Sequence, residues 1–256
     1  MPGRLKNKVA IITGGANGLG KATAQLFSRE GASVVVTDIL DDLGEEVAQG
    51  IRDEGGKAIY QRADALSEQD AQQTVEKAVS EFGKLDILMC NPAIQIEKTI
   101  PETTEEEWDR VIDLNLISTF NIARLAAAQM SQNDPDENDE RGVIINTASI
   151  AAFEGQIGQV AYTAAKAGIA GMSLTMARDL GSLGIRVMAI APSLFSTGLT
   201  AGIPEEMAAP LTQDAAFPRR MGMPEEYARL AQAIYETPML NGSTIRLDGG
   251  QRFAPK

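Results

Sequence analysis

Three polar residues near the middle of the chain have the types and spacing of a proton-transfer site. Tyr162 comes thirteen residues after Ser149, and Lys166 follows four residues later. Positions four apart on a helix share a face, so the phenol and the ammonium would be neighbours. A tyrosine ordinarily has a pKa of ~10, and a fixed positive charge lowers that pKa by favouring the phenolate. Tyr162 can then exchange a proton with a substrate hydroxyl while Ser149 hydrogen-bonds the same oxygen.

Tyrosine and lysine also occur four apart by chance, as a packed ring beside a surface lysine. Lys166 is, however, the only charged residue between Glu154 and Arg178. A lone cation on a helix of apolar and small residues is unusual for a surface lysine. This pattern favours the chemical interpretation of the pair.

The composition excludes several other kinds of site. The sequence has no histidine and one cysteine, Cys90. A Ser-His-Asp triad, a His-ligated metal and a cysteine cluster for zinc or iron–sulfur are therefore excluded. Acid–base chemistry must come from Asp, Glu, Lys or Tyr, and we expect no metal.

A second group of residues suits the binding of a nucleotide. The run TGGANGLG follows an apolar segment and precedes a helical pattern. Glycines in such a turn let the backbone approach a pyrophosphate that binds at the helix N-terminus. An ordinary strand-to-helix turn is the alternative. We expect cofactor contacts from Gly14, Asn17, Gly18, Leu19 and Gly20.

Asp38 ends the second apolar run, where a carboxylate can accept hydrogen bonds from both hydroxyls of an adenosine ribose. The same carboxylate would repel a 2′-phosphate. No Arg or Lys stands beside Asp38 or among Ala16 and Asn17, so the residues favour NAD over NADP. A plain turn residue is the alternative for Asp38. Asp64, followed by Ala65 after the third run, is placed to reach the adenine edge.

Alternating strands and helices must position these residues. Short apolar runs alternate with longer helical patterns almost to the end of the chain, which is typical of βαβ units and a doubly wound parallel sheet. The predicted strands are 9–13, 33–37, 58–61, 85–89, 143–147, 186–190 and 244–247. The predicted helices are 20–30, 43–53, 68–82, 105–129, 160–180 and 225–236. Without repeats or linkers, residues 1–256 are expected to form one α/β domain.

Charge and hydropathy limit the partners. The net charge is −12 with scattered Lys and Arg, so no basic face is available for nucleic acid. No apolar run approaches ~18 residues and no presequence is visible, which predicts a cytoplasmic protein outside the membrane. The acidic segment 131–140 is expected to be a solvated surface connection, with an interaction loop as the alternative.

The chain resembles the short-chain dehydrogenase/reductases over its whole length. TGGANGLG matches the family's TGxxxGxG, and Ser149, Tyr162 and Lys166 match its catalytic residues. Asn115 matches the helix asparagine that completes a proton relay through water to the lysine. The resemblance implies a single doubly wound Rossmann domain with a seven-stranded parallel sheet flanked by helices. It also implies cofactor contacts from Asn91, Ala93, Tyr162, Lys166, Phe195 and Thr197.

Within the family, RGVIINTASIAAFEGQ, GIRVMAIAPSLFST and NGSTIRLDGG are similar to the type 2 3-hydroxyacyl-CoA dehydrogenases, also called type 10 17β-hydroxysteroid dehydrogenases. That resemblance implies NAD, fatty acid metabolism, and oxidation of 3-hydroxyacyl-CoA esters or steroid-like secondary alcohols. The substrate is expected to meet a loop over residues 193–222. Its binding residues are predicted to be Ser149, Phe153, Ile157 and Leu199.

Two alternatives remain open. A 3-oxoacyl-carrier-protein reductase shares these residues, although such reductases usually use NADPH and Asp38 argues against that cofactor. A nucleotide-sensing scaffold would have lost catalytic residues, yet all four are present. The short loop after Ala93 has a single Lys98 and offers little positive charge to the anionic part of CoA.

The assembly is predicted from two helical segments, 111–130 and 160–180, which are apolar or small on most of their circumference. A monomer would expose the sides that do not cover the sheet. Ala126, Ala127 and Ala128 would let helices of two subunits approach closely. Together with the family resemblance, this predicts a homotetramer.

Overall fold

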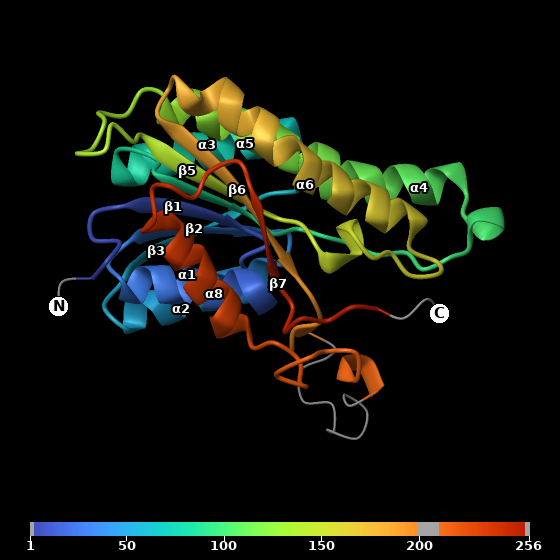
Figure 1. The fold of residues 1–256 in the computed structure, drawn as a ribbon. Coiled ribbons are helices and arrows are strands. Elements are labelled where there is room, and N and C mark those ends of the chain that lie inside the picture. Colours follow the sequence, from blue (N-terminus) through green and yellow to red (C-terminus); the bar gives the residue numbers. More distant parts are fainter. Residues whose placement is uncertain (1–2, 199–209, 254–256) are drawn as a thin grey trace.

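Seven parallel strands form one sheet in the computed structural model, which describes residues 3–198 and 210–253 (Figure 1). Their order is β3-β2-β1-β4-β5-β6-β7. The strands are β1 (Val9–Thr13), β2 (Ser33–Asp38), β3 (Lys57–Arg62), β4 (Ile87–Cys90), β5 (Gly142–Thr147), β6 (Ile185–Pro192) and β7 (Thr244–Leu247). The predicted α/β class and seven-stranded sheet are confirmed. The order reverses between β1 and β4, which is where doubly wound folds bind ligands.

Helices cover both faces of this sheet (Figure 1). One face carries α1 (Gly18–Arg29), α2 (Asp41–Asp53) and α8 (Pro224–Tyr235), and α8 packs beside α1. The other carries α3 (Glu68–Phe82), α5 (Ser118–Met130) and α6 (Val160–Gly181). Alternate residues of β1 enter the two cores, Ala10 and Ile12 on one side and Val9 and Ile11 on the other. The strands are apolar throughout because both of their faces are buried.

The predicted single helix over residues 105–129 is wrong in one respect. The structure contains α4 (Glu105–Ile112), a π-helical turn (Asp113–Ile117) and then α5. The wider turn leaves the axis continuous but shifts the side chains by about one position, which an apolar pattern does not reveal. By length and composition Glu105–Met130 could cross a membrane, but here its α5 part packs on the sheet core.

The prediction of a solvated connection over residues 131–140 is wrong at the end of that segment. The Glu140 carboxylate pairs with Arg186 of β6, and both side chains are nearly buried. Arg186 also donates to the carbonyl oxygens of Ile234 and Leu240, each at 2.9 Å. Glu140 therefore supports the cation that holds the C-terminal end of α8.

The expected role of the alanine run on α5 is also corrected. Ala126 and Ala127 are 0% and 5% exposed because they face the sheet core. Of the three alanines, Ala128 is the one on the exposed side. The outer surface of this helix therefore comes from other residues.

Candidate active site

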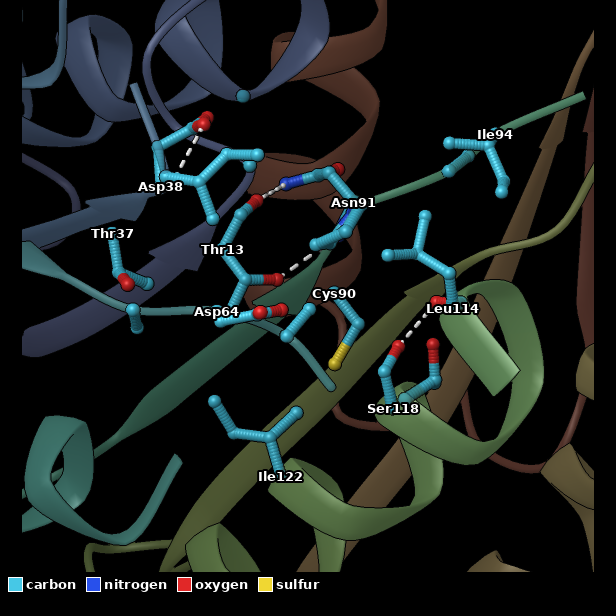
Figure 2. Close-up of a pocket in the computed structure, with 18 of the residues that line it drawn as sticks. Thr13, Thr37, Asp38, Asp64, Cys90, Asn91, Ile94, Leu114, Ser118 and Ile122 are labelled. Carbon is cyan, nitrogen blue, oxygen red and sulfur yellow. Dashed lines mark hydrogen bonds between the residues drawn. The ribbon is translucent and has the colours of Figure 1, made fainter. Parts of the chain in front are cut away.

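A cleft of about 590 Å³ opens where β1, β2 and β4 end, at the reversal of strand order (Figure 2). It receives residues from most of the segments that the sequence assigned to cofactor binding. The predicted residues that line it are Gly14, Asn17, Gly18, Leu19, Gly20, Asp38, Asp64, Ala65, Asn91, Ala93 and Thr197. Segments far apart in the sequence thus meet along one cavity.

Two glycines are required at the turn between β1 and α1. Gly18 has a φ of +52°, and a Cβ there would lie 3.1 Å from Cβ of Thr197. A Cβ on Gly20 would lie 2.1 Å from the carbonyl oxygen of Gly14. The turn therefore offers backbone N–H groups at the start of α1, a surface suited to an anionic pyrophosphate.

Asp38 lies at the cleft end of β2. Its Oδ2 accepts from Ala16 N at 3.1 Å, and its Oδ1 accepts from Ile39 N at 2.8 Å. The expectation that no cation stands near Asp38 is corrected, because Arg62 lies opposite it in the β2–β3 register. The Arg62 guanidinium pairs with Asp41 at 3.5 Å. The Arg62 cation is thus on the strand next to the Asp38 carboxylate.

The segment after β4 forms a second wall of the cleft. Asn91 Nδ2 donates to Thr13 O at 3.0 Å, and Asn91 N donates to Thr13 Oγ1 at 3.2 Å (Figure 2). Cys90 lies beside them, and burial raises the pKa of its thiol to about 12. The thiol therefore stays protonated at neutral pH and is no nucleophile.

The three residues of the predicted proton-transfer site come from β5 and α6. Ser149 follows β5, and its hydroxyl accepts from Ala151 N at 3.1 Å. Lys166 is 1% exposed, so the surface-lysine alternative is wrong. Its Nζ lies 5.7 Å from the centroid of the Tyr162 ring and donates to Thr147 O at 2.7 Å.

Burial shifts both titratable groups of this site. It lowers the pKa of Lys166 to about 7, because the ammonium is removed from water. Burial also raises the pKa of Tyr162, and the hydrogen bond with the Ser149 hydroxyl acts in the opposite direction. An amine that titrates near neutrality beside a phenol suits proton transfer at physiological pH.

Asn115 lies in the π-helical turn and is fully buried. Its Nδ2 donates to Val111 O at 2.8 Å and to Ile94 O at 2.9 Å, which ties the turn to the wall after β4. A Cβ on Gly168 would lie 2.9 Å from Leu116, so α6 approaches this turn closely. Between the described residues Asn115 and Lys166 no direct hydrogen bond forms, and the water relay stays a prediction.

A family model for the short chain dehydrogenases matches residues 8–208. The chain belongs to the short chain dehydrogenase family. It is an oxidoreductase that acts on CH–OH groups, and the family implies a nicotinamide cofactor. The site fits such a cofactor, with the glycine turn for phosphates and a carboxylate for a ribose. In addition, the buried Thr37 hydroxyl on the cleft wall has no protein partner in the described part of the chain.

This short chain dehydrogenase is similar to relatives along its whole length. It is 48% identical to the human 3-hydroxyacyl-CoA dehydrogenase type-2, over 98% of this chain and 97% of the relative. The crystal structure of a 3-hydroxyacyl-CoA dehydrogenase type-2 from Mycobacterium avium has a TM-score of 0.92 and 37% identity, and 98% of each chain is covered. A 3-oxoacyl-[acyl-carrier-protein] reductase of Thermotoga maritima is 36% identical, over 96% of this chain and 98% of the relative.

Several predicted site residues of this dehydrogenase lie elsewhere. Tyr162 and Lys166 are not part of the cleft wall, nor is Phe195, whose ring packs edge-on against Tyr227 with centroids 6.5 Å apart. Phe153 and Ile157 are 52% and 72% exposed. The substrate loop prediction and Leu199 fall in part on residues 199–209, outside the described residues.

Three residues of this dehydrogenase that sequence reasoning missed join the two parts of the site. Thr13 anchors Asn91, and Thr147 donates to Asn91 Oδ1 at 2.9 Å while its carbonyl holds Lys166. Tyr227 of α8 contacts the same oxygen at 3.1 Å. The two threonines could have been found from their place at strand ends that face the cleft. Nothing local in the sequence marks Tyr227.

Proposed function

We propose that this chain oxidises a secondary alcohol to a ketone, and catalyses the reverse reduction, with NAD and 3-hydroxyacyl-CoA or hydroxysteroid-like substrates. The observation that carries the proposal is the buried Lys166 beside Tyr162, joined through Thr147 and Asn91 to a cleft suited to a dinucleotide. The substrate class is supported by the likeness to 3-hydroxyacyl-CoA dehydrogenases over nearly the whole chain.

In this mechanism Tyr162 is the group that exchanges the substrate proton. Tyr162, as the phenolate, takes the proton of the substrate hydroxyl. A nicotinamide bound in the cleft would supply the acceptor for the hydride that the carbinol carbon loses. In its protonated form, which a pKa of about 7 keeps populated near neutral pH, Lys166 stabilises the phenolate by its charge, and Ser149 hydrogen-bonds the substrate oxygen. Because the chain lacks histidine, an inflection of the rate near neutral pH belongs to the Tyr162–Lys166 pair. Asn115 completes the proton path through water.

NAD is the proposed cofactor because Asp38 occupies the end of β2 and repels a 2′-phosphate. Arg62, which lies opposite Asp38 in the sheet, favours the second candidate function. That candidate is a 3-oxoacyl-carrier-protein reductase that uses NADPH, in which Arg62 would meet the phosphate. We favour NAD because the Arg62 guanidinium is paired with Asp41.

A homotetramer is the proposed assembly. Apolar side chains on the outward sides of α4, the π-helical turn, α5 and α6 are exposed in the single chain, and such patches usually mark interfaces. They are Trp108, Ile117, Phe120, Val160 and Leu174, between 36% and 49% exposed. Light scattering that gave a stable 27.3 kDa species at micromolar concentration would contradict this.

The decisive experiment compares substrates and cofactors by following the absorbance of the reduced cofactor. Oxidation of 3-hydroxyacyl-CoA esters or hydroxysteroids with NAD is expected, with little activity with NADP. Tyr162→Phe is the matched control, because it keeps the ring and removes the proton carrier. Reduction of a 3-oxoacyl-carrier-protein by NADPH, without activity toward the other substrates, would establish the second candidate instead.

A further inference from the structure

Three oxygen atoms, two of them buried, meet beside the cleft, between β5, the wall after β4, and α8. Thr147 Oγ1 and the Tyr227 hydroxyl are 2.6 Å apart. Both reach Asn91 Oδ1, Thr147 at 2.9 Å and Tyr227 at 3.1 Å. Tyr227 is 0% exposed, so water does not compete for its hydroxyl.

The number of protons decides how this triangle is bonded. An amide oxygen only accepts, and each hydroxyl has one proton to donate. At 2.6 Å one proton must lie between the two hydroxyls, so a single proton remains for Asn91 Oδ1. The three groups therefore form a chain in which Tyr227 and Thr147 together orient the Asn91 amide. Removing either hydroxyl deletes the bond between the two and leaves a single hydroxyl to orient the Asn91 amide.

Each end of this chain leads to a different part of the site. The oriented Asn91 amide donates from Nδ2 to Thr13 O and lines the cleft. The carbonyl oxygen of Thr147 accepts from Lys166 Nζ at 2.7 Å. Tyr227 lies in the core cluster on the α1 and α8 face, whereas Lys166 comes from α6 on the opposite face. The tyrosine thus acts on the lysine through strand β5.

We propose that Tyr227 is a positioning residue for both halves of the active site. Its hydroxyl holds Asn91 against the glycine turn and fixes the end of β5 that carries the carbonyl acceptor of Lys166. The inference rests on the proposed roles of Lys166 and Tyr162. A packing role alone would need the ring, which sits edge-on to Phe195, but not the hydroxyl.

The test is Tyr227→Phe, which removes the hydroxyl and keeps the ring. We expect NADH, titrated by its fluorescence, to bind roughly five- to tenfold more weakly, the effect of one buried hydrogen bond. The pH at which kcat is half-maximal should rise, because a less firmly held Lys166 stabilises the Tyr162 phenolate less. Among the described residues, the other titratable group that faces Lys166 is the Cys90 thiol on β4, whose raised pKa keeps it neutral.

Tyr235→Phe is the matched control, since it changes a tyrosine on the same helix whose hydroxyl forms no hydrogen bond with the described residues. It should leave NADH affinity and the pH midpoint unchanged. A lower melting temperature of Tyr227→Phe with unchanged affinity and midpoint would overturn the inference. If Tyr227→Phe fails to fold, Thr147→Val must show the same weaker NADH binding and higher pH midpoint. Thr147→Ser, which keeps the hydroxyl, must show wild-type values for both. Wild-type values for Thr147→Val would overturn it as well.

The NADH titration separates this inference from the proposed function. If the wild-type protein binds NADH but oxidises no alcohol in the panel, the proposed function fails. The affinity difference between the Tyr227 and Tyr235 variants still decides the role of Tyr227. In a double-mutant cycle, Tyr227→Phe and Thr147→Val should be non-additive, because they interrupt the same chain.

Discussion

Replacing Lys166 by methionine measures how much its buried amine contributes to the pH dependence of the free energy of unfolding. Burial lowers the pKa of Lys166 from 10.5 to about 7. Between these values an unfolded lysine keeps its proton while the folded one has lost it. The unfolded state then binds more protons, so the free energy of unfolding rises with pH.

The size of this effect follows from the shift. A full proton difference contributes about 1.4 kcal/mol per pH unit, and Lys166 is half-titrated at the start of the window. Cofactor-free wild-type protein should therefore gain about 2 kcal/mol of stability between pH 7 and pH 9 relative to Lys166→Met. The upper limit stays at pH 9 because the thiol of Cys90 and the phenols of Tyr60 and Tyr227 have raised pKa values. The protein loses stability at higher pH as these groups ionise in the unfolded state and stay protonated in the folded state.

Urea unfolding at pH 7, 8 and 9 measures the difference, at one fixed protein concentration because assembly contributes to stability. Lys57→Met is the control, since Lys57 is exposed on β3 and its loss should leave the wild-type slope unchanged. Parallel stability curves for the wild type and Lys166→Met would refute the reasoning. In that case the amine is charged throughout the window despite its burial.

Three further predictions follow from the site and the core. Asp38→Ala should raise kcat/KM with NADP because the carboxylate that repels a 2′-phosphate is gone while Arg62 stays opposite that position, and Asp38→Ala combined with Arg62→Gln should lose that gain in the same assay. Gly20→Ala should abolish NADH binding measured by fluorescence and destabilise the protein by about 1–3 kcal/mol, because its Cβ would lie 2.1 Å from a loop carbonyl oxygen. Glu140→Gln should cost about 3 kcal/mol in urea unfolding by leaving the Arg186 cation without its buried partner, with kcat unchanged.

Local signals made half of the site predictable from sequence. Strand β1 has the predicted bounds because its residues are apolar on both faces and glycines follow at once. The glycine turn and Asp38 belong to one strand-turn-helix-strand unit, so spacing alone places them at the cleft. Tyr162 and Lys166 lie four apart on one helix, which the 3.6-residue period requires to be neighbours.

Contacts set by register and by tertiary packing could not be predicted in this way. Arg62 is 24 residues from Asp38 along the chain and becomes its neighbour only through the pairing of β2 with β3. Tyr227 is separated from Asn91 by 136 positions. The π-helical turn around Asn115 carries the same apolar pattern as an α-helix. The family resemblance predicts that Phe195 contacts the cofactor, yet its ring packs against Tyr227 and does not line the cleft.

The contact between α1 and α8 has a consequence for the newly made protein. Helix α1 leaves the ribosome well before the helix that packs beside it, because α8 comes much later in the sequence (Figure 1). At ordinary rates of translation the two are synthesised roughly 10–40 s apart. Until then Phe27 and its neighbours on α1 lack the cover that α8 provides, and they are available to chaperones or to other nascent chains. This part of the native core can therefore close only after α8 has been synthesised.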